Sequence, residues 1–160
     1  MQFTCNTLDL IVAINTVSKA ISNRTANPIL SCMLLKVENH ELYLIGTDLE
    51  LSIKSKINAN IQEEGSLALD ARLFPEIIRR LPEGLIEITS DSSNYATIKS
   101  GKLEYKLAGQ PGSDYPELPV VEKNNAIVMG QDDLRNMTKS TIFSVATEET
   151  KPTENNNTQE

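Results

Sequence analysis

Apolar positions recur at helical spacing in two separate segments of the chain. The first segment predicts a helix that begins after the N-cap residue Asn6 and ends near residue 21. Its apolar stripe is Leu8, Ile11, Ile14, Val17 and Ile21. The second segment predicts a helix that begins after Asp70 and ends at the Pro-Glu-Gly sequence at 82–84. Its apolar stripe is Leu73, Phe74, Ile77, Ile78 and Leu81.

Short apolar runs between polar turns predict antiparallel strands around these helices. The expected strands are Gln2–Cys5, Ile29–Val37, Leu42–Gly46, Leu49–Ile57, Ser66–Leu69, Leu85–Thr89, Tyr95–Lys99 and Leu103–Leu107. The sequence Glu-Asn-His-Glu at 38–41 predicts a hairpin turn, and the proline- and glycine-containing stretch 109–123 predicts a linker. Two helices with about eight strands indicate the α+β class, with the helices packed on antiparallel sheets.

A second, weaker pattern follows the linker. A strand is expected at Ala126–Met129, and a helix is expected from Leu134, capped by the Gln-Asp-Asp sequence at 131–133. A shift of about 126 residues places Leu8 on Leu134, which suggests a repeated domain. The asparagine-rich residues after 150 show no periodicity and are typical of disorder. We therefore expect a first domain at 1–122, a truncated second repeat at 123–150 and a disordered tail at 151–160.

Composition places the chain among ordinary globular proteins. It has 160 residues, of which 39% are hydrophobic, and 22 acidic residues against 15 basic ones give a net charge of −7. No apolar run approaches the ~20 residues that cross a bilayer, and the N-terminus lacks the features of a secretory signal. We therefore expect a cytoplasmic protein without membrane contact. The acidic balance argues against general nucleic-acid binding, although it can hide a local basic face.

Candidate catalytic groups are few. Cys5 and Cys32 lie in apolar runs and are expected to be buried free thiols, and His40 is expected to be a solvated turn residue. Asp48 and Glu50 share one face of an extended segment, which suits either a magnesium ion or an ordinary polar turn. The sequence contains neither a phosphate-binding Gly-x-x-x-x-Gly-Lys loop nor a Gly-x-Ser-x-Gly nucleophile motif. We therefore expect no enzyme, no metal and no cofactor. A metal-dependent nuclease is the remaining catalytic alternative.

The basic residues are more informative. Arg72, Arg79 and Arg80 share one side of the second helix with Glu76, opposite its apolar stripe. Lys19 ends the first helix. Such a face is either an ordinary solvated surface or a sparse surface for phosphates, which would bind nucleic acid weakly and without sequence preference. No cluster of aromatic residues accompanies these cations, which argues against a single-strand stacking platform.

Several motifs together resemble the bacterial DNA polymerase III beta subunit, the sliding clamp. The matching stretches are Met1–Thr4, Asn-Pro-Ile-Leu at 27–30, Leu42–Glu50 with its Gly-Thr-Asp-Leu-Glu, Asp70–Gly84 ending in Leu-Pro-Glu-Gly, Ser-Asp-Tyr-Pro-Glu-Leu-Pro at 113–119 and Thr141–Ala146. The resemblance covers residues 1 to 150. It implies clamp domains whose helices line the hole of a closed ring around double-stranded DNA, with two protomers joined head to tail. It also implies polymerase and clamp loader as partners, bound through a pocket that lies outside this chain.

The resemblance assigns roles to individual residues. Arg24 matches a family position that contacts duplex DNA, and Lys19, Arg72, Arg79 and Arg80 are further candidates that line the hole. Residues 103–107 correspond to the edge strand that meets the other protomer. Its interface residues are Lys102, Leu103, Tyr105 and Leu107.

Three positions depart from the family pattern. Leu73 and Glu104 stand where basic interface residues are often found, and Glu148 stands where the family can carry a polar DNA contact.

The leading hypothesis is an N-terminal fragment of a processivity clamp. The alternative is a stand-alone interaction domain that caps a full-length clamp at the head-to-tail interface.

Overall fold

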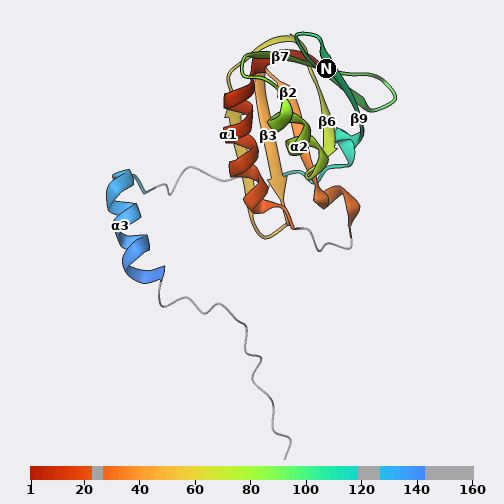
Figure 1. Ribbon diagram of the computed structural model, residues 1–160. Helices are drawn as coiled ribbons and strands as arrows, with labels where there is room; N and C mark the ends of the chain where they lie inside the picture. The colour runs from red at the N-terminus through yellow and green to blue at the C-terminus, as the bar shows by residue number, and fades with distance from the viewer. Residues whose placement is uncertain (23–26, 119–126, 143–160) are drawn as a thin grey trace, which may run out of the picture. The chain divides into compact units, whose positions relative to one another are not determined.

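The computed structural model describes residues 1–22, 27–118 and 127–142 (Figure 1). The chain divides into two compact units, Met1–Pro119 and Val120–Glu160, which are described separately. The strands of the first unit are β1 (Gln2–Asn6), β2 (Cys32–Glu38), β3 (Glu41–Thr47), β4 (Ser52–Ile57), β5 (Ala59–Glu63), β6 (Gly65–Asp70), β7 (Leu85–Ser90), β8 (Tyr95–Ser100) and β9 (Leu103–Pro111). Its α-helices are α1 (Thr7–Val17) and α2 (Leu73–Arg80).

The strands follow the order β4-β3-β2-β6-β9-β8-β7-β1-β5, and each pair of neighbours is antiparallel. Both helices lie on the same side of this sheet (Figure 1). The prediction of an α+β domain with helices on antiparallel strands is confirmed. The main core lies between sheet and helices and includes Phe3, Leu10, Leu35, Phe74 and Ile98.

Both predicted apolar stripes face the core except at their first residue. Leu8 is 48% exposed and Leu73 is 50% exposed, so both predictions of burial were wrong. The hydroxyl of Thr7 is buried and donates to the carbonyl of Gly84 at 2.9 Å, which holds the start of α1 against the strand that follows α2. In this first turn Leu10, rather than Leu8, is buried.

Three strand predictions also required correction. The strand expected at Leu49–Ile57 begins only at Ser52, because Leu49 has a positive φ and lies in a loop held by Asp48. Residues 28–31 form a 3-10 turn (Pro28–Ser31), so β2 begins at Cys32 and not at Ile29. The side chain of Asn27 accepts from the backbone N–H of Ile29, and Pro28 fits the first turn of a helix. Strand β5 was not predicted because it is mostly polar and exposed; pairing with β1 makes it a strand.

The predicted linker is partly a structural element. Strand β9 continues to Pro111, pairs with β6 from residue 109, and is followed by a 3-10 turn (Gly112–Asp114). Tyr115 is then buried in a second apolar cluster on the face of β2 and β3, and its hydroxyl donates to the Cys32 carbonyl. We call residues 112–118 the covering segment. The other part of the expected linker lies outside the described residues.

The second unit contributes one described helix, α3 (Gln131–Thr141). It starts three residues before the predicted Leu134, and none of its residues is buried within the described part of the chain. The expected strand at Ala126–Met129 is not a strand at 127–129, where the described residues offer no pairing partner, and Ala126 lies outside them. Glu148 and the expected tail also lie outside the described residues. None of the described helices is long and apolar enough to cross a membrane.

Candidate nucleic-acid interface and strand edge

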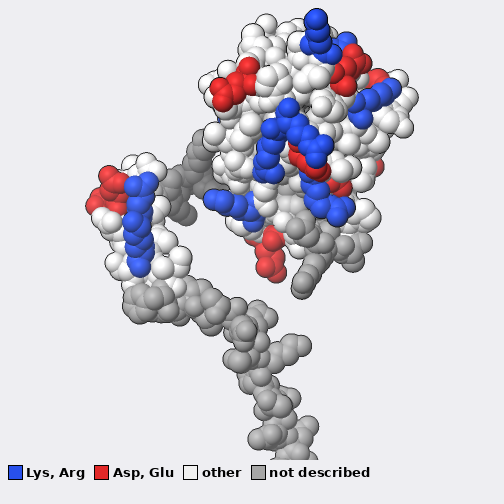
Figure 2. Space-filling view, viewed as in Figure 1, with Lys and Arg blue, Asp and Glu red and all other residues white. Residues whose placement is uncertain are grey.

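Helix α2 separates its apolar and basic side chains. Phe74 and Ile78 are fully buried, whereas Arg72, Arg79 and Arg80 are exposed on the opposite side. Figure 2 shows Lys and Arg side chains gathered over α2, with acidic side chains between them. Because guanidinium groups can bind phosphate oxygens in pairs, this side of α2 can hold an anionic backbone.

The three arginines have different partners. Arg80 forms an ion pair with Glu76 one turn earlier, with 2.5 Å between Nη2 and Oε1. Arg72 lies 3.9 Å from the Asp70 carboxylate, which is at the limit of an ion pair. Arg79 donates to the side-chain oxygen of Asn15 on α1 at 2.9 Å.

The Arg79–Asn15 hydrogen bond joins the exposed sides of the two helices into one surface. Asn15 was not identified from the sequence; the signal was its position four residues before Lys19, on the exposed side of α1. Lys19 is exposed in the 3-10 turn that follows α1 (Ser18–Ala20). The structure therefore brings four of the five predicted DNA-binding residues onto these two adjacent helical segments, and Arg24 lies outside the described residues.

Strand β9 offers an open edge in its first half. Residues 103–108 pair with β8 on one side, and among the described residues pairing with β6 starts only at Gly109. Unpaired backbone N–H and C=O groups on such an edge can accept a further strand. Leu103 is 43% exposed and Tyr105 is half-buried, but Leu107 is only 8% exposed and packs into the core.

Lys102 and Glu104, on either side of Leu103, have different surroundings. Lys102 is exposed in the turn before β9. Glu104, which departs from the family pattern, forms an ion pair with Lys99 of β8 at 3.6 Å, so its charge already has a partner within the chain.

The carboxylate of Asp48, a candidate metal ligand in the sequence, is bound by its own loop. Asp48 accepts the backbone N–H groups of Glu50 and Leu51, and these bonds, that of Leu51 first, lower the pKa of its carboxyl. Within the described residues no group of three His, Cys, Asp or Glu side chains could hold a metal ion. Cys5 and Cys32 are free and buried, as predicted, and burial raises the pKa of Cys5 to about 12. His40 lies exposed in the predicted hairpin turn.

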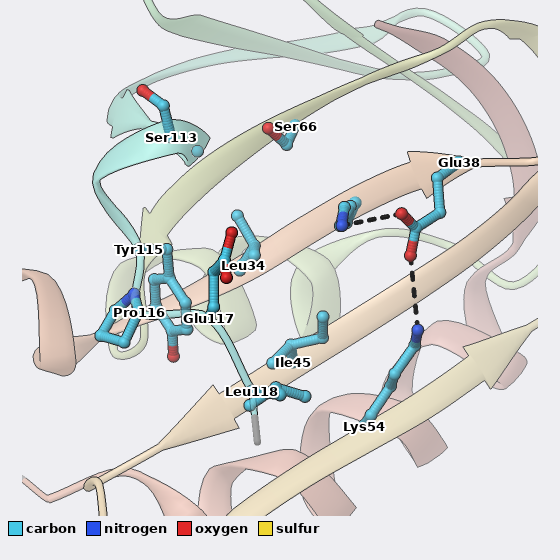
Figure 3. A pocket seen from close by; sticks show the side chains of 12 residues that line it. Leu34, Glu38, Ile45, Lys54, Ser66, Ser113, Tyr115, Pro116, Glu117 and Leu118 are labelled. Atoms are coloured by element: carbon cyan, nitrogen blue, oxygen red, sulfur yellow. Dashed lines mark hydrogen bonds and ion pairs between the residues drawn. The ribbon is translucent and has the colours of Figure 1, made fainter. Parts of the chain in front are cut away.

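A pocket of about 420 Å³ lies between the covering segment and strands β2 to β4 (Figure 3). Leu34, Ile45 and Leu118 contribute apolar side chains to it. At its polar end the Glu38 carboxylate lies between Lys36 at 2.7 Å and Lys54 at 3.4 Å. These ammonium groups, Lys36 first, lower the pKa of Glu38. Glu117 also lines the pocket, so the two ammonium and two carboxylate groups give the lining no net charge.

Known proteins resemble this chain over nearly its whole length. The beta sliding clamps of Bacillus subtilis (strain 168) and Staphylococcus aureus (strain N315) are 35% and 36% identical to it, and each match covers 95% of this chain. The solved sliding clamp of Bacillus subtilis superposes with a TM-score of 0.89 at 35% identity, covering 95% of this chain and 42% of that one. The beta subunit from the DNA polymerase of Streptococcus pyogenes gives 0.88 at 30% identity, with the same coverage.

The chain spans 42% of the length of the curated relatives that it matches. A family model described as the N-terminal domain of the DNA polymerase III beta subunit matches residues 1–119. This match covers more than half of the chain and coincides with the first compact unit. The chain therefore belongs to the DNA polymerase III beta subunit family and carries its N-terminal domain.

Proposed function

We propose that this chain is the N-terminal part of a DNA polymerase processivity factor, a sliding clamp that encircles duplex DNA during replication. The observation that carries this proposal is the exposed arginine-bearing side of α2, joined to α1 through Asn15 in a chain of net charge −7. A basic surface on an acidic protein concentrates the attraction for phosphates in one place. Membership of the beta subunit family supports the clamp over a stand-alone capping domain.

The proposed DNA-contacting residues are Arg24, Lys19, Arg72, Arg79 and Arg80. Their contacts go to phosphates, which position a duplex without reading its sequence. A sliding protein needs such loose contacts, because hydrogen bonds to base edges would hold it at preferred sites. We propose an accessory role without catalysis, in which closure of the ring, rather than affinity, keeps the protein on DNA.

The open edge of β9 is the proposed head-to-tail contact with a second protomer. Lys102, Leu103 and Tyr105 would present side chains there, and Leu107 would support the strand from the core side. We propose that residues 123–150 begin a second clamp repeat and that residues 151–160 form a separate tail. The pocket for polymerase and clamp-loader peptides is proposed to lie in the part of the relatives that this chain does not cover.

Titration of a labelled duplex with the whole chain tests the DNA-contacting surface. Fluorescence anisotropy at salt concentrations between about 20 and 200 mM should show weak binding that falls steeply with salt. Arg24→Ala and Arg79→Ala should each weaken binding severalfold and reduce the slope of log K against log salt by about 0.9. Two duplexes of unrelated sequence should bind equally.

Lys99→Ala is the matched control, because it removes one exposed positive charge from β8 rather than from α2. It should change the affinity less than either arginine variant. If all three variants bind duplex as the unmodified chain does, the proposed DNA-contacting surface is wrong.

A further inference from the structure

The charges on the exposed side of α2 include one carboxylate. Glu76 lies in the first turn of the helix, between Arg72 and the Arg79–Arg80 pair in the sequence. Its Oε1 lies 2.5 Å from Nη2 of Arg80, in an ion pair of i,i+4 spacing. Both side chains are more than half exposed, so both face the solvent from which a phosphate would approach.

Arg79 differs from its neighbour although the two are adjacent in the sequence. Among the described residues no carboxylate lies within 4.0 Å of the Arg79 guanidinium. Its partner is the neutral side-chain oxygen of Asn15, which orients the guanidinium and leaves its charge intact. Arg79 therefore keeps a full positive charge for an incoming anion, whereas the charge of Arg80 is balanced by Glu76.

We propose that Glu76 attenuates the affinity of the α2 surface for duplex DNA by occupying Arg80. This inference rests on the proposed function and names the residue that tunes it. Glu76 acts in two ways: it holds a donor of Arg80 that would otherwise meet a phosphate oxygen, and its own charge repels the phosphate. The first effect is local to Arg80, whereas the repulsion extends to phosphates near the other arginines, because charges interact over about 10 Å at 0.1 M salt.

The substitution Glu76→Gln tests this proposal, because glutamine keeps the shape and removes the charge. Duplex binding by the whole chain is measured by anisotropy at several salt concentrations. Releasing one arginine to a phosphate should steepen the slope of log K against log salt by about 0.9, which corresponds to roughly tenfold tighter binding at 50 mM salt. Glu104→Gln is the matched control: it also removes the carboxylate of an exposed ion pair, but on β9.

The double substitution Glu76→Gln/Arg80→Gln separates release of Arg80 from a general change in charge. The gain produced by Glu76→Gln should be mostly lost in the double variant, because the freed guanidinium is absent. Arg80→Gln alone should weaken binding, because it removes a positive charge and leaves the Glu76 carboxylate without its partner. Circular dichroism of each variant should show an unchanged fold.

If the unmodified chain binds duplex but Glu76→Gln binds no more tightly than Glu104→Gln, the role of Glu76 is wrong and the proposed DNA surface stands. If Glu76→Gln binds more tightly and the double variant keeps the whole gain, the role of Arg80 is wrong. If neither the unmodified chain nor Glu76→Gln binds duplex at low salt, the DNA surface and this inference are both overturned.

Discussion

At the scale of single residues, the nearest hydrogen-bond partner decides the role of a polar side chain. Asp48 has the spacing from Glu50 that a magnesium site could use, but its carboxylate accepts two backbone N–H groups of its own loop. Leu49, between them, adopts a positive φ of 80°, which the loop must hold against the usual preference of a leucine. Asp48 is therefore a loop-forming residue.

The backbone hydrogen bonds of Asp48 predict a pH-dependent contribution of this residue to stability. Because hydrogen bonds lower the pKa of its carboxyl in the folded protein, the contribution exists above the unfolded pKa and disappears as the pH falls through the folded pKa. Asp48→Ala should lower the urea midpoint at about pH 7, and the deficit should shrink at about pH 3. Glu50→Ala changes the same loop without removing these acceptors. An equal deficit at both pH values would contradict the expectation.

At the scale of elements, the covering segment shows how a sequence that looks like a linker becomes part of the fold. Gly109 lies so close to β6 that an added Cβ would meet the Ala68 carbonyl oxygen at 2.8 Å. At Gly112 an added Cβ would lie 2.5 Å from Ser66 Cβ. These glycines permit close packing, and Tyr115 then closes the outer apolar cluster; burial raises the pKa of its hydroxyl to about 12.

Gly112→Ala should therefore destabilise the first unit. Forcing a methyl group against β6 typically costs about 1–3 kcal/mol of unfolding free energy. Ser66→Gly should restore part of the loss in the double variant, because it removes the side chain that the new methyl group meets. Urea denaturation followed by tyrosine fluorescence measures both. A Gly112→Ala variant as stable as the unmodified chain would show that the covering segment is not packed at this position.

At the scale of the whole molecule, the first unit has a large apolar core, but half of strand β9 lacks a described neighbouring strand on one side. Its main apolar cluster draws on both helices and on strands from both ends of the sheet order. Strand β9 nevertheless leaves residues 103–108 without a described partner on one side. An edge of this length is normally covered, so the proposed protomer contact gives it a role.

A mixture with an intact sliding clamp, such as that of Bacillus subtilis, should produce a mixed complex through this edge. Tyr105→Asp should abolish the complex, because a charge would be buried beside the joined strands. Leu103→Asp, at a more exposed position, guards against misfolding of the first variant. Tyr95→Asp makes the same change on the inner strand β8 and should leave the complex intact. Size-exclusion chromatography with light scattering detects the complex; its formation by Tyr105→Asp and Leu103→Asp would exclude this edge.

Local sequence signals located most of the elements. Asn6 accepts the N–H of Leu8 as a helix cap should, and Asn39 and His40 form the expected turn with positive φ angles. The candidate site was predicted less completely. Helical periodicity placed Arg72, Arg79 and Arg80 on one side of the second helix, and Lys19 was placed at the end of the first. The position of Asn15 four residues before Lys19 does not reveal its partner on α2. The misjudged burial of Leu8 and Leu73 has a related origin: each is the first residue of its stripe, and periodicity does not show how far the core extends along a helix.

The sequence by itself determined which segments are helices and most of the strands, that the cysteines are buried, and to which family the domain belongs. These features depend on near neighbours in the chain or on short motifs. Only the tertiary structure decided how far the core extends along each helix, the strand character of β5, the packing of the covering segment and the partners of each arginine. Contacts between distant residues such as Thr7 and Gly84, or Asn15 and Arg79, set these features, and no local pattern encodes such a pairing.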